Sequence, residues 1–182
     1  MKQQKLDIRY KLTEDIRDFK APLLAQEILN NCLEKDLLLL CLEKDHLLSS
    51  RAMWVLGHCS DIDYDRIKPF HEQLIDNLKQ ENLHNGVIRN TLGLFQQYNV
   101  PATHEAFMLD KCYGYIKNPS EAIAVRTFSV SVVYNISKPY PELVQELSIV
   151  LNHLSLSDEG PAIRARVKNT LKDIAKRKLK DK

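Results

Sequence analysis

The sequence predicts an all-α protein built as an α-solenoid of four to five antiparallel helix pairs. Three observations lead to this fold class. Leucine supplies 27 of the 182 residues whereas Gly and Pro together supply 12, which favours helices over strands and turns. Apolar residues recur at intervals of three and four between the prolines, as on one face of a helix. Arginines recur at nearly constant long intervals, which indicates an internal repeat.

The individual helices follow from the apolar periodicity and from the prolines, whose missing N–H costs little in a first turn. The segment 65–80 shows the pattern, since Ile67, Phe70, Leu74 and Leu78 form one apolar stripe. Pro69 must then lie in a first turn. Equivalent patterns predict helices at 21–32, 35–45, 48–60, 84–98, 102–117, 120–137, 140–155 and 161–177, with a polar helix inside 4–18. Their short connections predict antiparallel hairpins.

The repeat length is about 38 residues. Four arginines near the starts of alternate helices are separated by 38, 37 and 38 residues: Arg51, Arg89, Arg126 and Arg164. The intervening helices keep the same register in two triplets: Leu74, Cys112 and Val150, and Leu78, Ile116 and Leu154. Each helix pair must stack on its neighbours to bury its apolar face. We therefore expect these six residues in the core, together with Trp54, Leu56, Leu92, Phe128 and Val132.

An apolar residue followed by Arg opens three first helices, at Ile88-Arg89, Val125-Arg126 and Ile163-Arg164. With the two-helix repeat, this pattern resembles the HEAT family of armadillo-type α-solenoids. The resemblance implies a right-handed superhelix with the first helix of each pair in an outer, convex layer. It also implies a structural ladder of Asp/Arg pairs between repeats, for which the candidates are Arg51, Arg89, Arg126, Arg164, Asp45 and Asp158. The pattern departs from the family where Asn82 and Asn118 precede Arg89 and Arg126.

The last two repeats are also similar to short bacterial HEAT-like proteins of unassigned function, some of which carry the name adenylosuccinate lyase. The lyase superfamily uses a Ser-Ser-x-Met-Pro loop in a chain more than twice as long. Here Ser49 and Ser50 are followed by Met53 but by no proline, within a predicted helix. The lyase activity therefore stays a remote alternative.

No cofactor, metal or catalytic site is expected from the motifs. The four cysteines have no C-x-x-C spacing and fit reduced, buried thiols. The two His-Glu pairs, at His71 and His104, lack a second histidine four residues on, so the six histidines are expected on helix surfaces or at caps. The acids of 61–65 start like a calcium loop, but Arg66 stands where glycine is needed, so we expect them to cap the next helix.

The domain organisation is expected to be one solenoid over 1–182, with a polar N-terminal cap at 1–20, repeats at 21–177 and a basic tail at 178–182. The net charge of +2 hides a cancellation. Residues 21–167 hold 13 basic and 18 acidic side chains, whereas residues 168–182 hold seven and two. The first residues lack the apolar stretch of a signal peptide, and no apolar run is long enough to span a membrane, so a cytoplasmic location is expected.

The leading functional hypothesis is a non-catalytic protein-interaction or scaffold module that presents an acidic concave groove to a protein or basic peptide, as a monomer or weak homodimer. The acids available on the second helices are Glu72, Asp76, Glu105, Asp110, Glu142 and Glu146. The alternative is a nucleic-acid-binding or DNA-repair protein of the HEAT-like glycosylase type, which would use the arginines, Trp54 and the basic end. The acidic repeat body argues against nucleic acid, because phosphate binding needs a basic surface.

Overall fold

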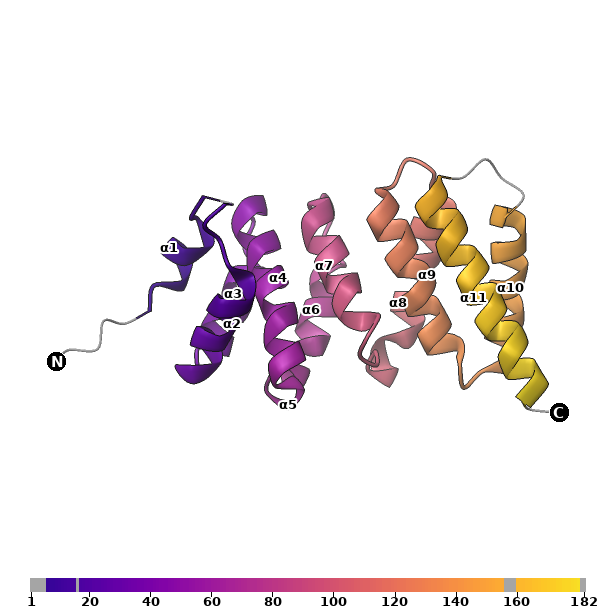
Figure 1. Cartoon of the computed structure of the whole chain (residues 1–182), viewed down its shortest axis with the longest axis horizontal. Helices are drawn as coiled ribbons and strands as arrows, with labels where there is room; N and C mark the ends of the chain where they lie inside the picture. Colours follow the sequence, from indigo (N-terminus) through magenta and orange to yellow (C-terminus); the bar gives the residue numbers. More distant parts are fainter. Residues whose placement is uncertain (1–5, 16, 156–159, 181–182) are drawn as a thin grey trace. The chain divides into compact units, whose positions relative to one another are not determined.

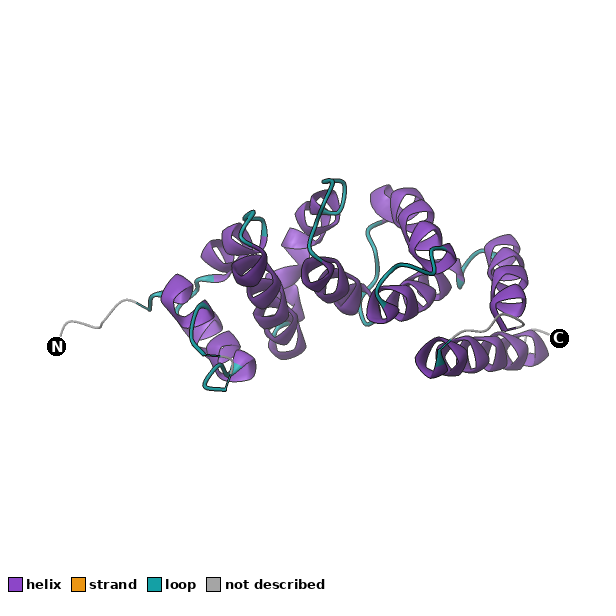
Figure 2. Cartoon of the chain, turned by 90° about the horizontal axis from the view of Figure 1, so that it is seen from above, coloured by secondary structure: helices purple, strands orange, loops and turns teal. Residues whose placement is uncertain are grey.

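A computed structural model of the chain describes residues 6–15, 17–155 and 160–180, and these residues form helices joined by short loops, with no strand among them (Figures 1 and 2). Each predicted helical segment contains a helix, and one of them, 65–80, is interrupted. The helices are α1 (Ile8–Leu12), α2 (Ala21–Asn30), α3 (Glu34–Cys41), α4 (His46–Ile62), α5 (Tyr64–Ile67), α6 (His71–Asn77), α7 (Asn85–Phe95), α8 (Glu105–Lys117), α9 (Ile123–Ser137), α10 (Pro141–Ser155) and α11 (Pro161–Lys180), with 3₁₀ turns at Lys68–Phe70 and Ala102–His104. None of these helices is long and apolar enough to cross a membrane.

The chain divides into two compact units, Met1–Leu94 and Phe95–Lys182. In the first unit, α4 packs against both α2 and α3, and α1 also contacts α4. Leu37 and Leu56 are fully buried between these helices, as are Ile28 and Cys59. A helix pair that lacks a core of its own is thereby stabilised by its neighbour, as a stacked repeat requires.

The C-terminus of α2 explains why this helix is shorter than its apolar pattern. Cys32 adopts a left-handed conformation with φ of 54°. The N–H of Leu33 donates to the carbonyl of Ile28 at 3.0 Å, and the N–H of Cys32 donates to that of Leu29 at 3.2 Å. These two bonds form a Schellman motif, which satisfies the last carbonyls and turns the chain toward α3.

The segment predicted as one helix over 65–80 is divided into α5, a 3₁₀ turn and α6. Pro69 lies in the first turn of the 3₁₀ piece, as expected. Since proline has no N–H to donate, the helix cannot continue through it with regular hydrogen bonds. The acids of 61–65 lie at the end of α4 and in α5, and Asp63, expected as a cap, makes no side-chain capping bond at the start of α5.

In the second unit, α8 packs against α9, and α9 and α10 both pack against α11. Figure 1 shows α9 and α11 running alongside each other. The buried serine hydroxyls of α9 are satisfied within the helix, because Ser129 and Ser137 donate to the carbonyls of Val125 and Val133 at 2.8 and 2.7 Å. The burial of α9 on two sides is therefore compatible with its hydroxyl groups.

Seven of the eleven predicted core residues are buried: Leu56, Leu74, Leu78, Leu92, Cys112, Ile116 and Val132. Phe128, Val150 and Leu154 are half-buried. The prediction is wrong for Trp54, which is 41% exposed on α4 and lies against Phe19 with ring centroids 5.6 Å apart. Its indole is held by the chain segment that precedes α2, a contact that helical periodicity does not record.

Two further expectations about burial are wrong. Cys32 is exposed, because the left-handed turn after α2 points it away from the core, whereas Cys41, Cys59 and Cys112 are buried. His71 is buried rather than on the helix surface. It lies four residues after Ile67 and therefore on the same apolar face of the chain.

Candidate interaction surfaces

The second unit brings three of the predicted acids together. Glu105 opens α8 and Glu142 lies in the first turn of α10, and both positions favour a negative charge because the helix N-terminus is partly positive. The hydroxyl of Tyr140 donates to Oε2 of Glu105 at 3.1 Å, which joins the two helix starts across 35 residues. This bond and the charge of Glu142 raise the pKa of Tyr140.

Glu146 lies one turn after Glu142 and is exposed. Burial raises the pKa of Tyr113 on α8 to about 12, and the charge of Glu146 adds to this, so Glu146 acts electrostatically on α8. Ile149 follows one turn later and is 65% exposed. We call Glu105, Tyr140, Glu142, Glu146 and Ile149 the acidic face of the second unit.

The other three predicted acids lie elsewhere. Asp110 is exposed on α8, but it lies five positions after Glu105 and hence about 140° around the helix. Glu72 and Asp76 are exposed on α6, in the first unit, and Asp76 forms an ion pair with Lys79. The six acids therefore lie in two units, and three of them share one face.

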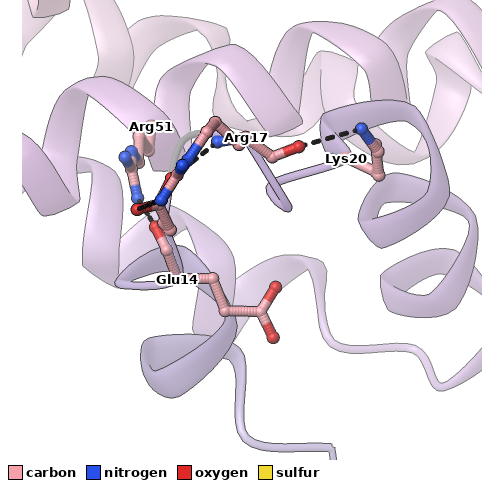
Figure 3. A network of polar contacts seen from close by, with 5 residues as sticks. Glu14, Arg17, Lys20 and Arg51 are labelled. Atoms are coloured by element: carbon pink, nitrogen blue, oxygen red, sulfur yellow. Dashed lines mark hydrogen bonds and ion pairs between the residues drawn. The ribbon is translucent and has the colours of Figure 1, made fainter.

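The arginines that share a register have different partners. Arg51 donates from Nη1 to the carbonyls of Leu12 and Glu14 at 2.9 and 2.6 Å, and its guanidinium lies 5.0 Å from the ring centre of Phe19. Figure 3 shows it in a polar network at Glu14, next to Arg17 and Lys20. Asp45 instead caps α4, accepting from the N–H groups of Leu47 and Leu48 at 3.0 Å.

Arg126 is buried and donates to the carbonyl of Ile116 from Nε and Nη2, at 3.3 and 3.1 Å. Arg89 is exposed, and its Nε donates to Oδ1 of Asn90 at 3.2 Å. Arg164 is also exposed, and Asp158 lies outside the described residues. Three of the hydrogen-bond acceptors of these four arginines are thus main-chain carbonyls, those of Leu12, Glu14 and Ile116.

Neighbouring repeats are connected by bonds that the register of arginines does not reveal. Nδ2 of Asn90 donates to the carbonyl of Ser50 at 2.7 Å, and Nδ2 of Asn135 donates to that of Gln96 at 2.8 Å. These bonds span 40 and 39 residues, about one repeat. At these two junctions, a side-chain amide therefore connects a repeat to the main chain of the one before.

An ion pair that sequence reasoning missed joins the first two repeats. Glu34, at the start of α3, pairs with Arg66 of α5, which also donates to the carbonyl of Leu29 at 2.9 Å. The side chain of Glu34 is only 10% exposed and that of Arg66 is 34% exposed. The acid lies within the run Leu33-Glu34-Lys35-Asp36, and only its burial distinguishes it from the exposed charges there.

Among the described residues, no group of three or more His, Cys, Asp or Glu side chains is arranged to hold a metal ion. The comparison with protein families matches residues 8–174 to the HEAT repeat domain. The comparisons with curated proteins and with solved structures give no significant match, so no relative supports a lyase activity. The match covers most of the chain, and the helix pairs of the structure, connected by hydrogen bonds one repeat apart, agree with this match. The chain therefore belongs to the HEAT repeat family.

Proposed function

We propose that the protein is a non-catalytic interaction module whose acidic face in the second unit binds a basic segment of a partner protein. HEAT repeats are typical protein-interaction domains, and this supports the general role. The convergence of Glu105, Glu142 and Glu146 from two helices supports the more specific one. Glu72, Asp76 and Asp110 lie outside this face and are not part of the proposed docking site.

The acidic face combines the two ingredients of a docking site. Ile149 is 65% exposed and Tyr140 is 37% exposed, so both offer apolar surface that a partner would cover. Such anchors surrounded by charge match the organisation of interfaces, where apolar or aromatic residues contribute affinity and rim charges contribute orientation and association rate. The partner chemistry is therefore an amphipathic segment with apolar anchors flanked by Lys or Arg.

A binding titration with a synthetic lysine–leucine amphipathic helix tests this function. The variant Glu142→Lys/Glu146→Lys should weaken binding at least about tenfold, because two attractions become repulsions. The control Glu27→Lys/Glu81→Lys alters exposed acids of the first unit and makes the same change in net charge, from +2 to +6. Equal binding by both variants would show that the acidic face is not the docking site.

Ile149→Ala provides a second readout within the same face. It leaves every charge in place, so an effect on the peptide dissociation rate would report the apolar contact alone. We expect faster dissociation with an unchanged dependence on salt. An unchanged dissociation rate would mean that the peptide is held by charge without docking on Ile149.

A further inference from the structure

The helix α11 carries a row of basic side chains along its exposed side. Arg164, Lys168, Lys172 and Lys176 are all exposed and are spaced four residues apart. Four residues of α-helix rise about 6 Å, so the row extends over roughly 18 Å. None of the four forms an ion pair with another described residue. Within the described residues, the four side chains therefore face solvent.

The surroundings of this row are also basic. Arg166 donates from Nη1 to Oγ of Ser131 on α9 at 2.7 Å, and Lys138 lies with Nζ 5.2 Å from the ring centre of Tyr134. Within α9 and residues 161–177 there are seven arginines and lysines, whereas Asp173 is the only acid. In contrast, α10 has Glu142 and Glu146 and no Lys or Arg. Charge is therefore separated between α10 on one side and α9 and α11 on the other.

The composition of the row narrows the class of partner. Among the α11 side chains that the structure describes, residues 161–177, no large apolar residue is exposed, so this part of the helix offers no anchor for insertion into a bilayer. Lysine is depleted in the cores of protein interfaces, and three members of the row are lysines. No exposed aromatic side chain is available on α11 as a stacking platform for the bases of a single strand. The remaining chemistry is phosphate.

We propose that the row Arg164, Lys168, Lys172 and Lys176 binds the phosphate backbone of a nucleic-acid duplex without reading its sequence. One strand of B-DNA presents a phosphate about every 3.4 Å along the axis, so the row of roughly 18 Å spans the axial length of about five phosphates. Four cations can then neutralise up to four of them. The acids of α10 repel phosphate and restrict the contact to the α9–α11 side. This site is separate from the acidic face and does not depend on it.

The test is fluorescence anisotropy of the full chain with a labelled DNA duplex of about 20 base pairs. Four neutralised phosphates give a slope near −3.6 for the logarithm of affinity against that of salt concentration, so binding should weaken about 150-fold between 50 and 200 mM salt. Lys168→Glu/Lys172→Glu/Lys176→Glu should abolish binding at 50 mM. Lys35→Glu/Lys44→Glu/Lys68→Glu makes the same net-charge change, from +2 to −4, at exposed lysines of the first unit and should retain it.

Four outcomes would overturn the proposal. The first is no duplex binding at 50 mM salt, and the second is an equal loss of DNA affinity in the two triple lysine variants. The third is tighter binding of a single strand than of the duplex. The fourth is self-association of the wild type that the α11 variant abolishes, without any DNA binding. Circular dichroism of both variants shows whether the helices are intact. Because the α11 substitutions face solvent, we expect unchanged spectra.

Discussion

Replacing Arg66 with methionine should destabilise the first unit by about 3 kcal/mol, because it leaves the Glu34 carboxylate buried without its partner. The reverse replacement, Glu34→Leu, should cost about 1 kcal/mol or less. The Arg66 side chain is 34% exposed against 10% for Glu34, so the guanidinium can reach water when it is left alone. The double variant Glu34→Leu/Arg66→Met should lie close to Glu34→Leu, since a buried charge is then no longer present.

The assay is urea unfolding followed by the fluorescence of Trp54, the single tryptophan, which lies in the same compact unit as the ion pair. With an m-value near 2 kcal/mol/M, the loss in Arg66→Met corresponds to a midpoint lower by about 1.5 M. The exposed pair Arg9–Glu43 is the matched control, and Arg9→Met should change stability by less than about 1 kcal/mol.

Two results would refute this reasoning. One is a midpoint shift for Arg66→Met no larger than that of Arg9→Met, which would mean that Glu34 is solvated without its partner. The other is additivity, in which the double variant loses the sum of the two single losses. Coupled residues in one buried pair should instead show an interaction energy well above about 0.5 kcal/mol.

Two further predictions follow from burial and backbone conformation. Burial, with a contribution from the charge of Lys68, lowers the pKa of His71 from 6.5 to about 4. The folded state therefore resists protonation of His71. The contribution of this neutral imidazole to the free energy of unfolding should be fully present above pH 6.5, and about 2–3 kcal/mol of it should be lost as the pH drops toward 4. Urea unfolding of His71→Leu against pH should lack this component, and a persistent loss would assign it to other groups. Cys32→Gly should raise stability by about 1 kcal/mol, because glycine adopts the φ of 54° without strain. In native thiol labelling the wild type should show one reactive cysteine and this variant none, and labelling of the variant would show that Cys41, Cys59 or Cys112 is accessible.

Much of the helical architecture could be predicted because it depends on local information. The 3.6-residue period and the prolines determine where each helix runs, and the stripe of Ile67, Phe70, Leu74 and Leu78 remains buried even where Pro69 interrupts the helix. The end of α2 was less predictable. Its Schellman motif places Cys32, a residue with no preference for left-handed backbone, where glycine is usual.

The contacts between repeats were largely beyond the sequence. Arg51 bonds to the carbonyls of Leu12 and Glu14, and a carbonyl is present at every residue, so this acceptor leaves no sequence signature. The exposure of Trp54 depends on Phe19, 35 positions earlier, which no helical period connects to it. The sequence placed Glu105, Glu142 and Glu146 on the second helices of the repeats but did not predict that they share one face. Their arrangement depends on Tyr140 and Tyr113, which no repeat pattern singles out.

The bonds from Asn90 to Ser50 and from Asn135 to Gln96 also affect how freely the repeats can change. Each bond requires a particular side chain in the later repeat but only a peptide group in the earlier one. The side chains at positions 50 and 96 can therefore be replaced without loss of the acceptor. If the order of the repeats were changed, the later repeat at each such joint would need a side-chain donor at the position of the asparagine, and apolar residues of matching volume. At these two joints the later repeat is constrained in its side chain and the earlier one only in its main chain, whereas the Glu34–Arg66 ion pair requires a particular side chain on both sides.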